Sequence, residues 1–387
     1  MVKVVRQVLL FAIGLWSLAG ISQADIQSVG ALPQSIKETS GLISYNGRLI
    51  THNDSGNAPE LYELHPETLQ ITRTIRVLNT ENTDWEDIAQ DEEFIYIGDI
   101  GNNRGDRQDL GILKIAKSDF NASDEVNAER IAFLYEDQND FTPSENSDFD
   151  AEALFVLGDN LIILTKQWQS EGTVAYKVPK ISGAFLAERI DTYQVDGLVT
   201  GADFDTSTNT LYLVGYSQFL TPFFVALNEV TNTAVFGVEK LKTNLDIGAA
   251  QVEALTFFEN TFYVTSEEFS SPPLVNSPSR LFTFSLDGTD EGEEVEEPNP
   301  APENEVAPSE GLIVYKPFSG LDLNYELNTD KSIFGMGIFD SNGRMVQYTP
   351  LERITEGPLD ISSFSQGLYY LTFFYDNKAI SSPFFRD

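Results

Sequence analysis

The sequence predicts an all-β chain, a five-bladed β-propeller followed by a small β-sandwich, and three observations support this. Residues 25–286 hold short apolar runs divided by Gly, Asn and Asp, with almost no helical periodicity. A pattern of two apolar strands recurs five times, about 50 residues apart. An acidic, proline-rich stretch, residues 287–310, then separates this region from a second set of alternating strands at 311–387.

The N-terminus predicts export. Lys3 and Arg6 precede an apolar run, and Ser22-Gln23-Ala24 fits a small-x-small cleavage site, so residues 1–24 are interpreted as a secretory signal peptide. A membrane anchor is the alternative, but the run is short for a span. No later stretch is long and apolar enough to cross a bilayer. We therefore expect a secreted or outer cell-surface protein without a transmembrane anchor in the mature chain.

The composition excludes several classes of function. Lys and Arg number 24 against 60 Asp and Glu, a net charge of −36, which argues against nucleic acid and against docking on anionic lipid. The chain has no cysteine, which excludes disulfides, thiolate metal sites and a catalytic Cys. Only His52 and His65 could serve histidine-dependent catalysis. Such an acidic surface is compatible with divalent cations.

Each repeat begins with an acidic residue and ends, 13 or 14 positions later, with a polar one. The opening acids are Glu38, Glu86, Glu152, Asp203 and Glu253, and the closing residues are His52, Asp99, Lys166, Tyr216 and Glu267. A repeat of this length, all β, is typical of propeller blades. The spacing of 66 after the second acid is interpreted as an insertion at 136–148.

The last repeat supplies three evident strands, EALTFF, TFYVTS and RLFTFSL. The segment IQSVGALP, at the mature N-terminus, is predicted to add the fourth strand. This pairing would close the ring and leave no open sheet edge. Six blades are the alternative count, and a β-sandwich is the alternative architecture.

The opening acids are predicted to form a ring at one mouth of the channel, because the first strand of each blade lines it. The closing residues form a wider ring on the same face, to which loops add Asp54, Asn102, Asn103 and Arg104. Close carboxylates raise one another's pKa, so these acids cannot all ionise without support. Three resolutions exist: some acids are protonated, or they pair with Lys166 or Arg104, or they bind a cation, for which Ca²⁺ is the candidate. The alternative is that each acid caps backbone donors in its own blade.

The leading functional hypothesis is a protein that binds a small-molecule or surface ligand at an acidic, cation-containing channel mouth. The second hypothesis is a metal-assisted hydrolase, a phosphoesterase or lactonase, with His52 or Asp99 as general base. The third is a structural surface protein. Whether the chain is an enzyme stays open at this point, since propellers host many unrelated activities.

The C-terminal region resembles the sorting domain of proteins exported by the type IX secretion system. The resemblance rests on Val314-Tyr315-Lys316-Pro317, on GIFDSNGRMV and on LDISSFSQGLYYLTFF, and covers residues 311–387. It implies a small Ig-like sandwich of seven strands that serves as an address label, with the export machinery as its partner.

The large region is similar in style to phytase-like secreted propellers. The matching residues are the opening acids, above all Glu152-Ala153-Leu154 and Glu253-Ala254-Leu255. The resemblance implies inner strands that line a calcium-bearing channel.

Overall fold

The computed structural model describes residues 26–218, 220–271, 275–286, 311–315, 322–328, 335–340, 345–350, 359–375 and 378–386. The chain separates into two compact units, divided between Thr289 and Asp290, and each is described by itself. The predicted signal peptide, residues 1–24, and the predicted linker, residues 287–310, lie outside the described residues. Within the part of the chain that is described, no helix is long and apolar enough to span a membrane.

The strands of the first unit form successive antiparallel groups of four. The first groups are β2 (Thr39–Tyr45), β3 (Arg48–Asn53), β4 (Glu60–Leu64) and β5 (Ile71–Val77), then β6 (Trp85–Gln90), β7 (Phe94–Asp99), β8 (Gly111–Ala116) and β10 (Glu129–Tyr135). The next are β11 (Ala151–Leu157), β12 (Asn160–Thr165), β13 (Thr173–Pro179) and β14 (Gly183–Tyr193), then β15 (Leu198–Asp205), β16 (Thr210–Tyr216), β17 (Pro222–Asn228) and β18 (Val238–Asn244).

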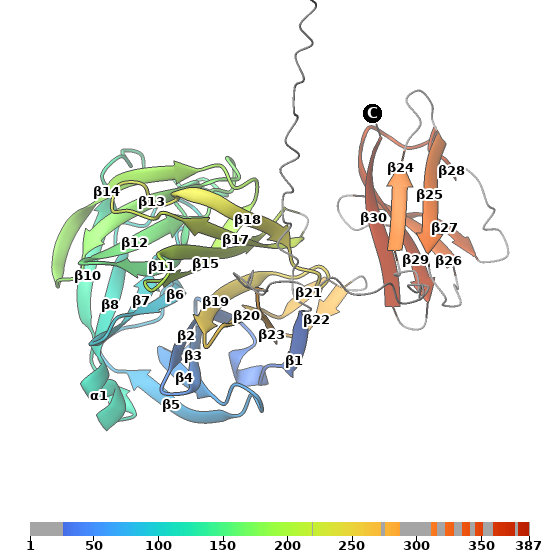
Figure 1. Cartoon of the computed structure of the whole chain (residues 1–387). Coiled ribbons are helices and arrows are strands. Elements are labelled where there is room, and N and C mark those ends of the chain that lie inside the picture. The colour runs from blue at the N-terminus through green and yellow to red at the C-terminus, as the bar shows by residue number, and fades with distance from the viewer. Residues whose placement is uncertain are drawn as a thin grey trace, which may run out of the picture. The chain divides into compact units, whose positions relative to one another are not determined.

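The first strands of these groups surround a common centre. Strand β2 contacts β6, β6 contacts β11, β11 contacts β15, and β15 contacts β19 (Val252–Phe258), which in turn contacts β2. Each sheet extends outward from this closed ring (Figure 1). Apolar side chains of neighbouring sheets pack between them, as Leu164 and Leu213 do between β12 and β16. The chain is therefore all-β, and its first unit has the architecture of a β-propeller, as the sequence predicts.

The two ends of the ring are joined in one sheet. Strand β1 (Gln27–Ala31) pairs antiparallel with β23 (Arg280–Phe284), in a sheet ordered β1-β23-β20-β19 with β20 at Thr261–Ser266. This confirms the predicted pairing of the N-terminal segment with the last repeat. The short strands β21 (Phe269–Ser271) and β22 (Val275–Ser277) pair with each other before β23.

We expect deletion of residues 26–31 to lower the melting temperature of the propeller markedly. The deletion removes β1, the strand that pairs with β23. The backbone groups of β23 that face β1 are then unpaired, and the N-terminal segment no longer closes the last sheet. Thermal unfolding followed by circular dichroism would measure the effect. An unchanged melting temperature would contradict the role assigned to this strand.

The second and third groups of strands join into a single eight-stranded sheet, because β10 and β14 pair in parallel. A short helix, α1 (Lys117–Ala122), and strand β9 (Glu125–Val126) lie between β8 and β10, and β9 extends the first sheet beside β5. Residues 136–150, before β11, contain no strand or helix. They include the insertion at 136–148 that the unequal spacing predicts.

One buried carboxylate ties three inner strands together. The Asp87 side chain on β6 is almost fully buried, and its Oδ2 accepts the Leu154 amide of β11 at 2.8 Å. It also accepts the amide of Ala202 on β15, while Oδ1 accepts the Ile88 amide at 2.8 Å. Burial raises the pKa of Asp87 well above its usual value, and these amides act in the opposite direction.

The described strands of the second unit lie in two sheets. One contains β24 (Gly311–Tyr315), β25 (Asp322–Asn328) and β28 (Leu359–Asp360), and the other is ordered β27 (Met345–Pro350), β26 (Gly335–Asp340), β29 (Gly367–Tyr375) and β30 (Lys378–Arg386). Leu323 of the first sheet and Ile338, Leu371 and Phe384 of the second share one apolar core.

Candidate functional site

A β-bulge interrupts the beginning of every inner strand, and it decides which side chain reaches the channel mouth. The pairing of each inner strand with its neighbour shifts by one residue at this point. The bulged residues are Gly41 on β2, Glu86 on β6, Glu152 on β11, Thr200 on β15 and Glu253 on β19. Bulges re-aim side chains in this way. The predicted ring of acids is thus carried by three strands.

The three bulged glutamates are buried and line one cavity of about 180 Å³. The described residues around it are Ser40, Asp54, Glu86, Asn103, Glu152, Lys166, Trp168, Tyr216, Gln251, Glu253 and Glu267. All of them carry a hydrogen-bonding group and none is aliphatic. The cavity therefore suits a hydrophilic occupant.

The charges that line this cavity do not balance. Among the described lining residues, five carry carboxylates and only Lys166 carries a positive charge. Burial and, after it, nearby carboxylates raise the pKa of Asp54 and Glu267 to about 7. Burial also raises the pKa of Glu86 and Glu253 well above the usual value. Burial is the main cause of these raised pKa values, and repulsion between neighbouring carboxylates adds to it.

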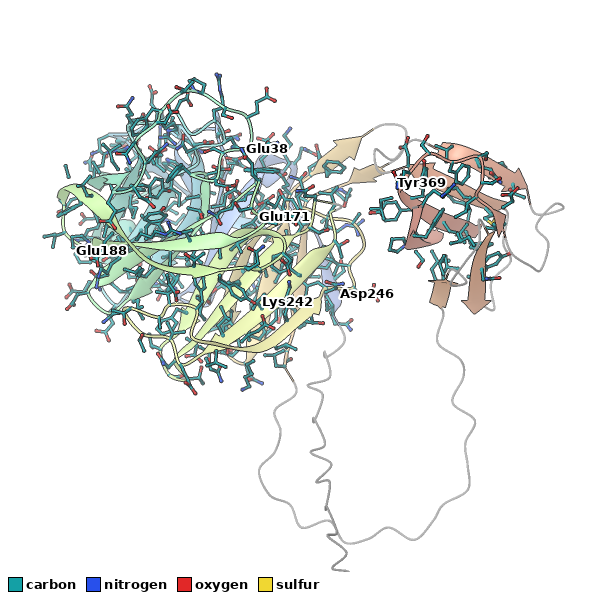
Figure 2. All side chains as sticks on the ribbon, turned by 90° about the horizontal axis from the view of Figure 1, so that it is seen from above. Glu38, Glu171, Glu188, Lys242, Asp246 and Tyr369 are labelled. Carbon is teal, nitrogen blue, oxygen red and sulfur yellow. The ribbon has the colours of Figure 1, made fainter. Side chains whose placement is uncertain are left out.

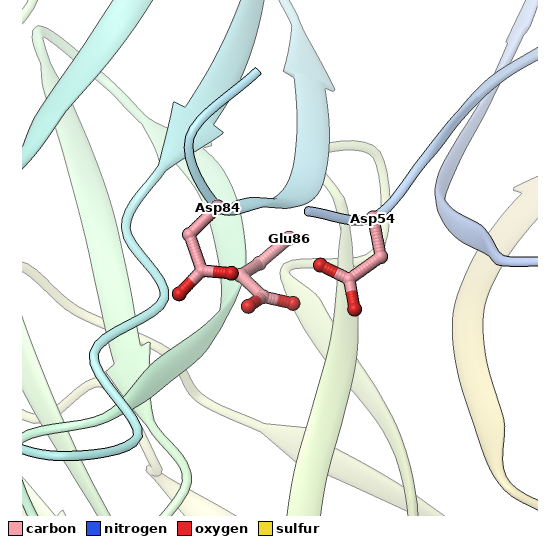
Figure 3. A group of neighbouring side chains, drawn as sticks. All are labelled: Asp54, Asp84 and Glu86. Atoms are coloured by element: carbon pink, nitrogen blue, oxygen red, sulfur yellow. The ribbon is translucent and has the colours of Figure 1, made fainter. Parts of the chain in front are cut away.

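The densest part of the site is formed by Asp54, Asp84 and Glu86. One carboxylate oxygen from each lies within 4.8 Å of the others. Figure 3 shows Glu86 between the two aspartates, with the three carboxylates directed into the same space. Asp54 follows β3, while Asp84 and Glu86 lie two residues apart where β6 begins, so their side chains share one side of the chain.

Glu86 is the unusual member of this group. Its exposed fraction is 4%, yet among the described residues its carboxylate makes no hydrogen bond or ion pair. An ionised buried carboxylate without a partner costs several kcal/mol. Asp54, by contrast, accepts the Ser55 amide. The Glu86 carboxylate therefore has both of its oxygens available to an occupant of the cavity.

The loop after β7 leaves room beside these carboxylates because residue 101 is glycine. A Cβ added to Gly101 would lie 2.5 Å from Asp84 Cγ, and closer still to Asp84 Oδ2 and Glu86 Oε1. Hydrogen bonds hold the loop in place, since the Gly101 amide donates to Asp84 O at 3.2 Å and Arg107 Nη1 donates to Gly101 O at 2.7 Å. Any larger residue here would fill the space between the carboxylates.

The other half of the cavity is organised around Lys166. Its ammonium lies 2.8 Å from Glu152 Oε1 and over the rings of Trp168 and Tyr216, at 4.7 and 5.3 Å from their centroids. Glu152, and after it Tyr216 and Glu253, raise the pKa of Lys166 well above its usual value, against the effect of burial. Lys166 is thus a permanent cation at this site.

Trp168 is held in place by a second buried acid. Its Nε1 donates to Asp150 Oδ2 at 2.9 Å, and Asp150 Oδ1 accepts the Asn102 amide at 2.6 Å. Asp150 therefore connects the loop after β7 to the loop after β12, at the rim of the cavity. Burial and the neighbouring Glu152 raise the pKa of Asp150 to about 8.

Several predicted ligand-binding residues reach the cavity and others do not. Asp54, Asn103, Lys166, Tyr216 and Glu267 line it. Asn102 is buried behind it, where Nδ2 donates to Phe149 O at 3.3 Å and Oδ1 accepts the Arg107 amide at 2.9 Å. Arg104 is exposed and is not among the lining residues.

The two residues predicted as general bases lie behind the inner strands. His52 is buried, packs edge-on against Trp85 at 5.6 Å between ring centroids, and has a pKa lowered to about 4 by burial. Asp99 is paired with Arg107 at 2.9 Å and with Arg130 at 3.2 Å. Neither lines the cavity. His52 pairs with Ser40 and Asp99 pairs with Trp85, each the residue directly before a bulge. The bulged residue, Gly41 or Glu86, comes one position later.

Glu38 and Asp203 were also predicted in the ring, and the structure places them elsewhere. Glu38 lies in the turn before β2, where it accepts a hydrogen bond from Asn57 Nδ2 at 2.7 Å and pairs with Lys37. Asp203 lies three residues beyond the bulge of β15 and lines a different cavity, of about 540 Å³, further along the inner strands. Its Oδ2 accepts the Phe257 amide at 2.7 Å, which ties β15 to β19.

Five residues of the site were not among the predicted ligands. They are Ser40, Asp84, Asp150, Trp168 and Gln251. Asp84 and Asp150 each lie two positions before a predicted acid, so strand alternation would have found them. Gln251 occupies the same place before Glu253, and its Nε2 donates to Tyr216 Oη at 3.3 Å.

No family model matches the sequence, and no curated protein is similar to it at a significant level. The solved structures that resemble it weakly include the following three. An exo-β-1,3-galactanase from Phanerochaete chrysosporium, with galactose, is 9% identical over 93% of this chain and 92% of that one, at a TM-score of 0.46. A Bombyx mori GH32 β-fructofuranosidase in complex with sucrose is 13% identical over 91% and 87%, at a TM-score of 0.41. A GH43 β-xylosidase/α-arabinofuranosidase from a compost microbial metagenome, in complex with xylotriose, is 11% identical over 70% and 98%, also at 0.41.

Proposed function

We propose that this chain is an exported five-bladed β-propeller that holds one Ca²⁺ ion at the acidic mouth of its channel and binds a small-molecule or surface ligand there. The N-terminal signal sequence supports secretion or display on the outer cell surface. The C-terminal region, taken as an Ig-like type IX sorting domain, supports export by that machinery. The two-sheet core of the second unit agrees with such a domain.

The observation that carries the cation proposal is the unpartnered Glu86 carboxylate between Asp54 and Asp84. Ca²⁺ takes six to eight oxygen ligands, and carboxylates, carbonyls and water supply them. Neutralisation of these acids by a bound cation would lower their raised pKa values. Because residue 101 is glycine, no side chain presses on the Asp84 and Glu86 carboxylates, which are thus left to the ion.

The ligand-binding part of the proposal rests on what surrounds this ion. Asn103, Trp168 and Gln251 line the same cavity from loops or strand ends. They are not among the three proposed ligands of the ion, so they remain available to a bound molecule. An ion held by three carboxylates keeps coordination positions for oxygen atoms of a ligand. The aromatic ring of Trp168, fixed by Asp150, offers a flat apolar face beside these polar groups.

A metal-assisted hydrolase is the second candidate. One specific observation favours it, since Glu267 lines the cavity with a pKa near 7 and therefore exchanges a proton at neutral pH. A lactone or another neutral ester fits this site better than a phosphoester does. Lys166, the one cation among the described residues that line the cavity, is already paired with Glu152. Loss of lactone or ester turnover in Glu267→Gln, with Ca²⁺ affinity retained, would support this candidate.

The cation proposal predicts that Ca²⁺ binds the mature chain with one-to-one stoichiometry, and that Glu86→Gln weakens binding at least about tenfold. Isothermal titration calorimetry would measure both. Saturation with Ca²⁺ at about 100 times Kd should raise the melting temperature by about 5–10 °C, and EDTA should reverse this.

The control for this experiment is Glu188→Gln. Glu188 is an exposed residue of the outer strand β14, paired with Lys177 and labelled in Figure 2. This substitution removes the same charge from the propeller without touching the mouth. Absence of both Ca²⁺ heat and a melting shift in the unmodified protein would refute the cation proposal.

A further inference from the structure

We propose that Lys166 is a built-in counter-cation that occupies the second half of the acidic mouth and restricts it to a single divalent ion. This inference deepens the proposed function and rests on it. The half formed by Asp54, Asp84 and Glu86 would hold the ion. The half formed by Glu152 and Glu253 already holds a cation, the ammonium of Lys166, which is paired with Glu152.

The contacts of Lys166 are those of a bound cation. The ammonium lies against a buried carboxylate, 2.8 Å from Glu152 Oε1, and faces two aromatic rings. The lysine and glutamate side chains are only 5% and 7% exposed. Aromatic faces and carboxylates together are the groups that attract an ammonium ion. The chain itself thus supplies the cation of this half.

Among the described residues, Lys166 makes its close ion pair with Glu152 and with no carboxylate of the other half. At longer range its charge also acts on Asp54, Asp150 and Glu253. The charges that act most on Glu86 are carboxylates, Glu152 and Asp54 foremost. The Glu86 carboxylate, buried and without a hydrogen bond among the described residues, is therefore left to an external ion. The half with Glu152 takes its cation from the chain itself, as the ammonium of Lys166. The half with Glu86 takes its cation from solution.

The mouth without Lys166 should accept a second cation. Removal of the ammonium leaves the buried Glu152 without its ion-pair partner. Glu253 and Glu267, which line the same cavity, lose the positive charge that acts on them. An uncompensated buried carboxylate is strongly unfavourable. A second Ca²⁺ ion relieves this cost, so the stoichiometry of binding reports on the role of Lys166.

The test is calorimetric titration of the mature chain with CaCl₂, comparing Lys166→Met with the unmodified protein. We expect one Ca²⁺ per chain in the unmodified protein and two in Lys166→Met. Lys166→Arg keeps the charge and should keep one. Lys180→Met is the matched control, because Lys180 also pairs with an aspartate, Asp91, at 2.8 Å, but away from this mouth.

The outcomes separate the two proposals. One ion in both the unmodified protein and a folded Lys166→Met would overturn the role of Lys166 and leave the calcium site intact. No ion in the unmodified protein and one in Lys166→Met would refute the calcium site and support the counter-cation. If Lys166→Met does not fold, Lys166→Gln in the presence of ethylammonium provides the second test. Recovery of the native melting temperature with this small cation supports the inference, and failure to recover it contradicts it.

Discussion

Gly101→Ala should weaken Ca²⁺ binding by at least about 100-fold, or about 2.8 kcal/mol. The new methyl group would overlap the space between the Asp84 and Glu86 carboxylates, which are the proposed ligands. Gly101 has no left-handed backbone conformation that would strain an alanine, so the effect is expected on the ion rather than on the loop. Calorimetry with CaCl₂ would measure it.

The matched control for this variant is Gly172→Ala, in the loop after Trp168. Gly172 also lacks a left-handed conformation, and its nearest neighbour for a Cβ is Gln167 Oε1 at 3.0 Å, the end of a flexible side chain. This variant should bind Ca²⁺ as the unmodified protein does. Equal affinity of Gly101→Ala and Gly172→Ala would contradict the position assigned to the ion.

Asp87→Ala should destabilise the propeller by about 3–5 kcal/mol. The carboxylate is buried at the centre of the ring and accepts the amides of Leu154 and Ala202 from two other inner strands. Its removal leaves these buried donors unsatisfied and opens a cavity, and each unsatisfied donor costs about 1–3 kcal/mol. Urea denaturation would measure the loss as a lower midpoint with an unchanged slope.

Asp205→Ala provides the comparison. Asp205 accepts the Ser207 amide at 2.8 Å within a single hairpin turn and ties no strands of different sheets together. We expect a loss of at most about 1 kcal/mol. A similar loss for both variants would show that Asp87 does not join the inner strands as described.

The sequence predicts the propeller because the same two-strand pattern occurs five times along the chain. Alternating apolar strands, turn residues and a near-constant spacing each specify the same architecture, and the pairing of β1 with β23 follows from a missing fourth strand. The site depends instead on single-residue register. The repeat aligned Glu38 with Glu86, whereas the bulge of β2 places Gly41 in that position.

The surroundings of Gly41 explain why no acidic residue stands at this position of β2. It has a φ of +67°, and a Cβ there would lie 2.8 Å from both His52 Nε2 and the Ile88 amide. The close approach of β2 to β6 therefore requires glycine. In the same way the fourth inner strand carries Thr200, whose hydroxyl donates to Val252 O, while Asp203 is displaced three residues onward.

The closing residues show the same effect of register. In three sheets the closing residue comes one position after the residue that pairs with the start of the bulge. These closing residues reach the cavity, and they are Lys166, Tyr216 and Glu267. His52 and Asp99 stand at the pairing residue itself, and their side chains point the other way. A shift by one residue moves a strand side chain to the opposite face, and no composition or spacing argument resolves it.

The central claim is that Asp54, Asp84 and Glu86 bind a calcium ion, and a crystal grown in CaCl₂ tests it most directly. The proposal predicts an anomalous difference peak bounded by these three carboxylates, with ligand distances of about 2.3–2.6 Å. Well-ordered density for the three side chains without such a peak, or a calcium peak only at another place on the propeller, would contradict it.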